Sequence, residues 1–153
     1  MTTVFDVPPD RLIKCVGDKL KAGGASTPPK WAGFVKTGAH REKAPVQRDW
    51  WHYRVAAVLR KIYINGPIGV ERLSADFGGK RDRGAAPYHA VQGSRSIARM
   101  AIHQLEKAGY VTANKSRGRT ITPKGRSFVD NTAHEILSEL VKTRPEMQKY
   151  LKK

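Results

Sequence analysis

The sequence lacks the features that would place a chain in an oxidising compartment or a membrane. Its 153 residues include one cysteine, Cys15, which can form no disulfide within the chain and has no companions at metal-ligand spacing. No run of about 18 apolar residues is present, as a spanning helix would require. The start MTTVFDVPPD also lacks the order of a signal peptide. We therefore expect a soluble, cytoplasmic chain with no role at a membrane and with Cys15 as a small core residue.

Acidic residues are also scarce. The chain has 29 Lys and Arg against 13 Asp and Glu, a formal net charge of +16 and a pI of about 10.3. Residues 30–77 and especially 78–126 hold almost all of the excess, whereas residues 1–29 and 127–153 are nearly neutral. Like charges gathered in this way destabilise a compact state unless a partner neutralises them. The pattern favours a polyanionic partner over a merely solvated surface.

Signatures of catalysis and of metal binding are missing as well. Gly78-Gly79-Lys80 lacks the leading glycine and the trailing Ser or Thr of a phosphate-binding loop, and neither G-x-S-x-G nor H-E-x-x-H occurs. The histidines are far apart along the chain and have no Cys partners; they are His40, His52, His89, His103 and His134. We expect no enzymatic activity, no metal, no cofactor and no small-molecule substrate.

The hydrophobic pattern predicts a mainly helical chain. The predicted helices cover about residues 9–22, 49–65 with Asp49 as the cap, a short stretch around 70–77, 94–108 and 122–142. Two runs with strand propensity, residues 110–112 and 120–122, flank the polar loop NKSRGR and predict a hairpin. Residues 25–48 are rich in Pro, Gly and cations and predict an ordered basic loop, and residues 78–93 predict an exposed loop.

The order of these elements predicts the fold class. Between residues 49 and 122 the predicted elements follow the order of a winged-helix domain: a helix, a short helix, a long helix and a hairpin, which is the wing. We predict a mainly α, winged-helix-like domain around a central amphipathic helix, with one small β-hairpin. The length suits a single domain over 1–153, divided into a helix and basic loop (1–48), a core (49–142) and a tail (143–153).

Cations recur at the positions where winged-helix folds meet nucleic acid. Arg95, Arg99 and His103 follow each other every four residues on the predicted third long helix. Three more cations lie in the hairpin loop: Lys115, Arg117 and Arg119. Arginine suits this task because its planar fork grips phosphate oxygens with two hydrogen bonds and stacks on exposed bases. The alternative is that these side chains only solvate the surface.

Five ordered blocks of sequence resemble one known family. They are WAGFVKTG (31–38), DWWHYR (49–54), LRKIYINGPIGV (59–70), FGGKRDRG (77–84), and LEKAGYV (105–111) with GRTITPKG (118–125). Together they look like the nineteenth small-subunit ribosomal protein of the archaeal and eukaryotic type, over roughly residues 31–133. Only the last pair is generic, since it occurs in many winged-helix proteins. His52 departs from the pattern, which has another aromatic residue there.

The resemblance implies a place in the head of the small ribosomal subunit, on the 3′ domain of its ribosomal RNA and beside neighbouring ribosomal proteins. It also implies a part in subunit maturation and in translation, and we expect the free protein to be a monomer. Together with the charge pattern, it gives these candidate RNA contacts: Lys36, Arg41, Lys43, Arg48, Arg54, Arg60, Lys61, Lys80, Arg81, Arg83, Arg95, Arg99, Lys115, Arg117, Arg119 and Lys124.

Two other functions are compatible with these residues. A winged-helix DNA-binding regulator would need a dimer to read two half-sites, and the sequence has no spare long dimerisation helix. A protein assembly adaptor without nucleic acid would bind in a way that survives high salt, unlike binding dominated by phosphate contacts.

Several aromatic residues are candidates for stacking on bases. They are Trp31, Trp50, Trp51, Tyr53 and Tyr63. Trp51 and Tyr63 stand at core-helix spacing, so we expect them to pack inside the protein, and Trp50 is left open.

Overall fold

The computed structural model describes residues 2–114 and 117–150. Its helices are α1 (Pro9–Ala22), α2 (Trp50–Asn65), α3 (Val70–Asp76), α4 (Arg95–Lys107) and α5 (Pro123–Thr143). Its strands are β1 (Gly79–Arg83), β2 (Ala86–Val91), β3 (Val111–Asn114) and β4 (Gly118–Ile121). Short 3-10 turns cover Val4–Asp6, Lys30–Gly33 and Pro145–Tyr150. The predicted mainly α, winged-helix-like fold is confirmed.

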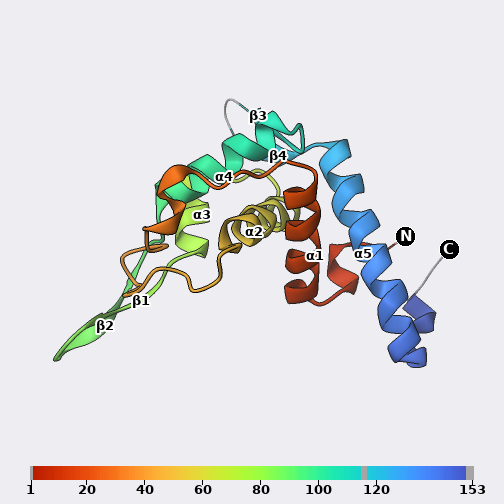
Figure 1. Cartoon of the computed structure of the whole chain (residues 1–153), viewed down its shortest axis with the longest axis horizontal. Helices are drawn as coiled ribbons and strands as arrows, with labels where there is room; N and C mark the ends of the chain where they lie inside the picture. The colour runs from red at the N-terminus through yellow and green to blue at the C-terminus, as the bar shows by residue number, and fades with distance from the viewer. Residues whose placement is uncertain (1, 115–116, 151–153) are drawn as a thin grey trace.

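The hydrophobic core is built around α2, which lies between α1 and α4 (Figure 1). Val55, Val58, Leu59 and Ile62 are all fully buried, because their spacing of three and four residues puts them on the faces that meet the neighbouring helices. The helix begins after Asp49, as predicted, but this side chain does not cap it. The Asp49 carboxylate instead accepts a hydrogen bond from Lys21 of α1 at 2.8 Å.

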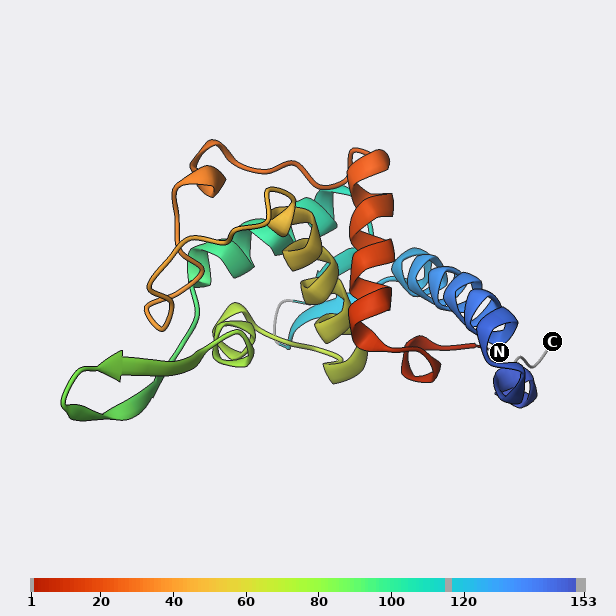
Figure 2. The same ribbon diagram turned by 60° about the horizontal axis from the view of Figure 1, so that its bottom comes forward.

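Two helix starts predicted from the sequence have the expected caps. The Ser94 hydroxyl accepts a hydrogen bond from the Ile97 amide at the start of α4 (3.4 Å), and the Thr122 hydroxyl accepts one from the Gly125 amide at the start of α5 (3.1 Å). Helix α5 then packs along α1 at one end of the molecule (Figure 2). The caps fix where α4 begins and therefore which of its side chains face outward.

The hairpin β3–β4 is the predicted wing, and it is tied back to the core. Ile68, between α2 and α3, exchanges two backbone hydrogen bonds with Arg119 of β4, at 3.0 and 2.9 Å. Gly118 has a φ of 102°, and a Cβ there would lie 2.7 Å from the backbone of Ile68. Only glycine fits this close approach. Lys115, predicted at the tip of the wing, lies outside the described residues.

The predicted loop over residues 78–93 is a second hairpin, β1–β2. Gly79 pairs with Val91 and Arg81 with His89, and the carboxylate of Asp82 accepts a hydrogen bond from the Gly84 amide in the turn (2.8 Å). The loop prediction was wrong because the strands have no buried face, so no alternation of apolar residues marks them. The expectation of exposure was correct, and the hairpin projects away from the helices (Figures 1 and 2).

The basic loop over residues 25–48 is ordered, as predicted, and is held by a few specific contacts. Gln104 of α4 binds it at two points, because its side chain accepts from the Thr27 amide (3.2 Å) and donates to the Thr27 carbonyl (2.6 Å). Further along, the Ser94 amide donates to the carbonyl of Thr37 (3.0 Å). The loop is therefore fastened to both ends of α4.

The three tryptophan side chains pack in or against the hydrophobic core. Trp51 is fully buried, which confirms the prediction of packing, and its indole N–H donates to Gln104 (3.0 Å). Trp50 is also buried, and its indole N–H donates to the carbonyl of Ala32 (3.2 Å). Trp31 of the basic loop packs edge-on against Trp51 with ring centroids 5.5 Å apart. Trp50 therefore packs inside the protein and anchors the basic loop.

His52 should make the stability of the fold depend on pH. Its ring is buried and hydrogen-bonded to Ser26, so the face that carries it is tightly packed. Burial lowers the pKa of His52, although the nearby carboxylates Asp49 and Asp18 act in the opposite direction and Lys21 acts with burial.

The direction in which stability changes with pH follows from proton binding to His52. Below the ordinary histidine pKa of about 6.5, the unfolded chain binds a proton that the folded His52 resists, so stability falls as the pH falls. We expect a lower melting temperature at pH 5.5 than at pH 7.5 by circular dichroism, and a smaller difference in His52→Gln. The exposed His89→Gln is the control, and an unchanged pH dependence in His52→Gln would contradict the assignment.

Candidate nucleic-acid interface

The described candidate contacts divide by exposure. Exposed are Lys36, Arg41, Lys43, Arg48, Lys80, Arg81, Arg83, Arg95, Arg99, Arg117 and Lys124. Half-buried are Arg54, Arg60, Lys61 and Arg119. Lys115 lies outside the described residues. Most of the candidates therefore have side chains that a partner can reach.

Helix α4 exposes Arg95 and Arg99, whereas its residues Ile97, Ala101 and Ile102 are buried. Within the described part of the chain neither arginine forms an ion pair. His103, on the same helix, is instead bonded to Glu106 at 3.2 Å. The two arginines are therefore available for an anionic partner.

Three candidates are partly engaged inside the protein. Arg119 of the wing pairs with Glu106 of α4 at 3.1 Å, and Lys61 of α2 pairs with Asp76 at 3.4 Å. The ammonium of Lys124 donates to the carbonyl of Ala108 after α4 (3.2 Å). Sequence spacing could not reveal these contacts because each joins two different elements. They fasten the wing and the helices, so these three cations have less charge to offer a partner.

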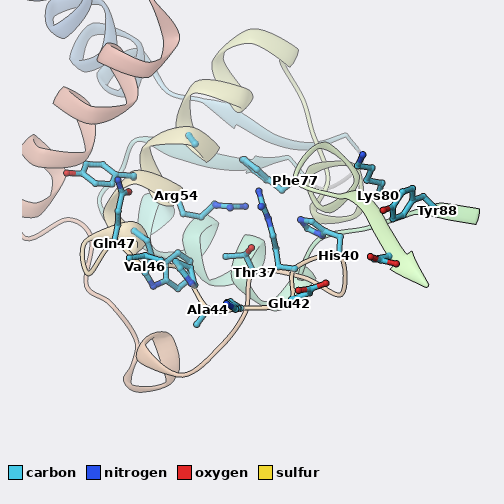
Figure 3. Close-up of a pocket in the computed structure, with 17 residues that line it drawn as sticks. Thr37, His40, Glu42, Ala44, Val46, Gln47, Arg54, Phe77, Lys80 and Tyr88 are labelled. Atoms are coloured by element: carbon cyan, nitrogen blue, oxygen red, sulfur yellow. The ribbon is translucent and has the colours of Figure 1, made fainter. Parts of the chain in front are cut away.

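One cleft, of about 810 Å³, gathers candidates that are far apart in the sequence. The basic loop contributes Arg41 and Lys43. Helix α2 contributes Arg54 and the hairpin β1–β2 contributes Lys80 (Figure 3). The other lining residues are Thr37, His40, Glu42, Ala44, Pro45, Val46, Gln47, Trp50, Tyr53, Ala57, Phe77, Asp82 and Tyr88. The fold thus brings cations from three segments around a single hollow.

Arg54 extends from α2 into this cleft toward Phe77 (Figure 3). Its guanidinium lies over the Phe77 ring, 4.4 Å from the centroid, which fixes its position. Burial and the neighbouring Arg41 both lower the pKa of Arg54, although a guanidinium stays protonated at neutral pH. No described carboxylate forms an ion pair with Arg54. A partly buried charge without an internal carboxylate partner favours an anion in the cleft.

His40 lies across the cleft and was not among the candidate contacts. A Cβ on Gly38 would lie 2.7 Å from its ring, and one on Gly79 would lie 3.1 Å away, so the ring occupies a space that two glycines leave open. Its Nδ1 atom is buried without a hydrogen-bond partner in the described structure. Burial lowers the pKa of His40, as do Arg41 and Arg54.

Comparison with known protein families identifies the chain. The profile of the family described as Ribosomal protein S19e matches residues 3–139, which is nearly the whole chain.

The chain belongs to the Ribosomal protein S19e family.

Relatives of this S19e chain match it over 90–99% of its length. The small ribosomal subunit protein eS19 of Thermoplasma acidophilum is 49% identical over 151 residues, covering 99% of this chain and 100% of the relative. That of Aeropyrum pernix is 48% identical over 153 residues, with the same coverage of both chains. The protein eS19A of Schizosaccharomyces pombe is 38% identical over 137 residues, covering 90% of this chain and 95% of the relative. The resemblance seen in the five sequence blocks is confirmed.

The sequence did not point to two aromatic residues of the S19e cleft. Tyr88 is 60% exposed on β2, and the ammonium of Lys80 lies 5.0 Å from the centroid of its ring. Phe77 holds Arg54 from the other side of the cleft. Tyr88 could have been found, because it stands in a cationic segment without apolar periodicity and so has no core to pack into.

The described part of this S19e chain holds no group of three or more His, Cys, Asp or Glu side chains placed to bind a metal. None of its helices combines the length and the apolar character needed to cross a bilayer.

Proposed function

We propose that this chain is a structural component of the small ribosomal subunit. It binds ribosomal RNA of the 3′ domain in the head of the cytoplasmic subunit, lies beside neighbouring ribosomal proteins, and supports subunit maturation and translation. Relatives that match the full length carry the name small ribosomal subunit protein eS19. The observation that carries the RNA-binding part is the set of exposed cations on α4, the basic loop and the hairpin β1–β2 that form no ion pair within the described residues.

The arrangement of these cations suits a folded RNA. Phosphate oxygens are the chemical feature that every RNA segment presents, and arginine binds them with its planar fork. The polar face of α4 supplies Arg95 and Arg99, and the projecting hairpin supplies Arg81 and Arg83. Because these elements point to different regions around the body, the protein can fasten RNA segments that are not adjacent to each other (Figures 1 and 2).

The hairpin β1–β2 itself supports the proposal. A lone two-stranded hairpin with no buried face has little stability of its own in water. Its edges carry Lys80, Arg81 and Arg83, and charged edge residues discourage pairing with strands of other chains. A polyanion that neutralises these cations would stabilise the hairpin. It is therefore suited to a role within an assembly that contains nucleic acid.

The opposite end of the molecule is suited to protein neighbours. Helices α1 and α5 lie there (Figure 2), in segments where acidic and basic residues nearly balance. Glu135 on α5 already pairs with Lys19 on α1 at 2.5 Å. We propose that this face meets ribosomal proteins of the head and that the free protein is a monomer.

Binding to small-subunit RNA should depend strongly on salt. A transcript of the 3′ domain should bind the purified protein, and the affinity should fall by roughly 10³ to 10⁵ between about 50 and 200 mM salt if about 6 to 10 phosphates are contacted. Filter binding over a salt series measures the slope. In a lysate, the protein should sediment with small subunits at moderate salt.

The same measurements distinguish the two other functions. A DNA-binding regulator would sediment as a free dimer and prefer duplex DNA over the transcript. An adaptor that binds only proteins would ignore the transcript and keep its partner at high salt. Either result would overturn the proposal.

A further inference from the structure

The cleft beside α2 differs from the rest of the basic surface because its cations surround a hollow. Burial and the neighbouring Arg41 both lower the pKa of Arg54, and neither arginine forms an ion pair with a described carboxylate. The ring of His40 also lines the cleft, although its Nδ1 atom is buried against Gly38 and is not open to a ligand. Two guanidinium groups without an internal ion pair among the described residues therefore line one space.

The two carboxylates that line the cleft form no ion pair with its arginines. Asp82 lies near the end of β1, where its carboxylate accepts a hydrogen bond from the Gly84 amide of the turn at 2.8 Å. Glu42 is exposed on the basic loop and forms no ion pair within the described structure. Arg54 lies deeper and is only half exposed. The charge at the bottom of the cleft thus favours an anion that enters from outside.

The walls of the cleft are aromatic and apolar. Tyr88 is 60% exposed with Lys80 over its ring, and Val46 is 96% exposed at the other end (Figure 3). Phe77 lines the side and supports Arg54. Aromatic rings interleaved with cations are what grooves for single-stranded nucleic acids use, because bases stack on the rings while cations track the phosphates.

The size of the cleft is compatible with a single nucleotide. About 810 Å³ falls within the range of about 300–1,000 Å³ over which pockets hold small molecules. A base-paired duplex exposes its phosphates on an outer surface and keeps its bases stacked inside, so it can meet only the cations on the rim. A nucleotide turned out of a helix can place both its phosphate and its base inside.

We propose that this cleft is a binding site for one unpaired nucleotide of the ribosomal RNA, whose phosphate lies on Arg54 and Arg41 and whose base lies against Tyr88. The inference rests on the proposed function, since it names a specific feature of the RNA that the protein binds. It separates two tasks: α4 grips duplex backbone, and the cleft recognises a bulge.

The test compares two RNA hairpins that differ by one nucleotide, an uninterrupted stem and the same stem with one bulged uridine. Fluorescence anisotropy measures the affinity of the full-length protein for each. The wild-type protein should bind the bulged hairpin about tenfold more tightly, the gain expected for one stacked base and its phosphate. In Arg54→Gln and in Tyr88→Ala this preference should disappear, while the affinity for the uninterrupted stem changes little.

A matched variant on another surface distinguishes a general loss of RNA affinity from a loss of the preference for the bulge. Arg95→Gln together with Arg99→Gln should weaken binding to both hairpins and leave the preference for the bulge intact. A preference that persists in both Arg54→Gln and Tyr88→Ala would overturn the cleft proposal, as would equal binding of both hairpins by the wild type. In those cases tight binding to the uninterrupted stem would leave the proposed function standing. Failure to bind either hairpin or the 3′ domain transcript would overturn both.

Circular dichroism separates loss of a contact from loss of the fold. Arg54 and Tyr88 are not part of the hydrophobic core. We therefore expect both variants to keep the helical spectrum of the wild type. A variant that loses the preference for the bulge but keeps this spectrum supports the proposal.

Discussion

Replacing Arg95 and Arg99 together with glutamate should lower the affinity for small-subunit RNA by at least about a hundredfold, since a charged hydrogen bond contributes about 1.5–3 kcal/mol. Both side chains are exposed on the polar face of α4 and form no ion pair within the described residues. The substitution removes two contacts and places two carboxylates against phosphates. Filter binding at moderate salt measures the loss, and incorporation into subunits should fail in cells.

The control reverses two positive charges on another face of the protein. Arg11 and Lys14 are exposed on α1, so changing both to glutamate alters the net charge by the same amount. If RNA binding depends on the face of α4, this variant should bind nearly as well as the wild type. Equal losses in the two variants would mean that net charge alone drives binding. Normal incorporation of the α4 variant would show that this helix does not contact the RNA.

Truncating Trp51 to alanine should destabilise the fold by about 3–5 kcal/mol, the usual cost of removing a buried large aromatic side chain. This is a large part of the total stability of about 5–15 kcal/mol of a typical domain. Trp51 is fully buried, packs edge-on against Trp31 and Trp50 with centroids 5.5 Å away in each case, and donates to Gln104. Denaturant unfolding followed by circular dichroism measures the change.

The consequences should reach the candidate RNA surface. Trp51 holds Gln104, which in turn fastens Thr27 at the start of the basic loop. We expect Trp51→Ala to loosen this loop, so limited proteolysis should cut there before it cuts the helices. Trp51→Phe keeps most of the buried area and loses only the indole contacts, so it should cost clearly less. Equal losses in the two variants would show that the hydrogen bond, not the packing, dominates.

The sequence alone determined the helices, the wing and the family. Its basic charge also indicated a negatively charged partner. Periodic apolar residues fixed α1 and α2, and Ser94 and Thr122 marked where α4 and α5 begin. These signals are local, since each depends on residues a few positions apart. The concentration of charge in the middle of the chain is likewise readable without a structure.

Only the tertiary structure decided which cations are free and which are engaged. Arg119 and Lys61 look like Arg95 in the sequence, yet each pairs with an acid on a different element. The cleft that unites Arg54 with Tyr88 joins residues 34 positions apart, and the hairpin that carries Tyr88 has no periodic signal. Ion pairs, clefts and two-sided exposed hairpins depend on distances in space between distant segments, and no local pattern of residues encodes those distances.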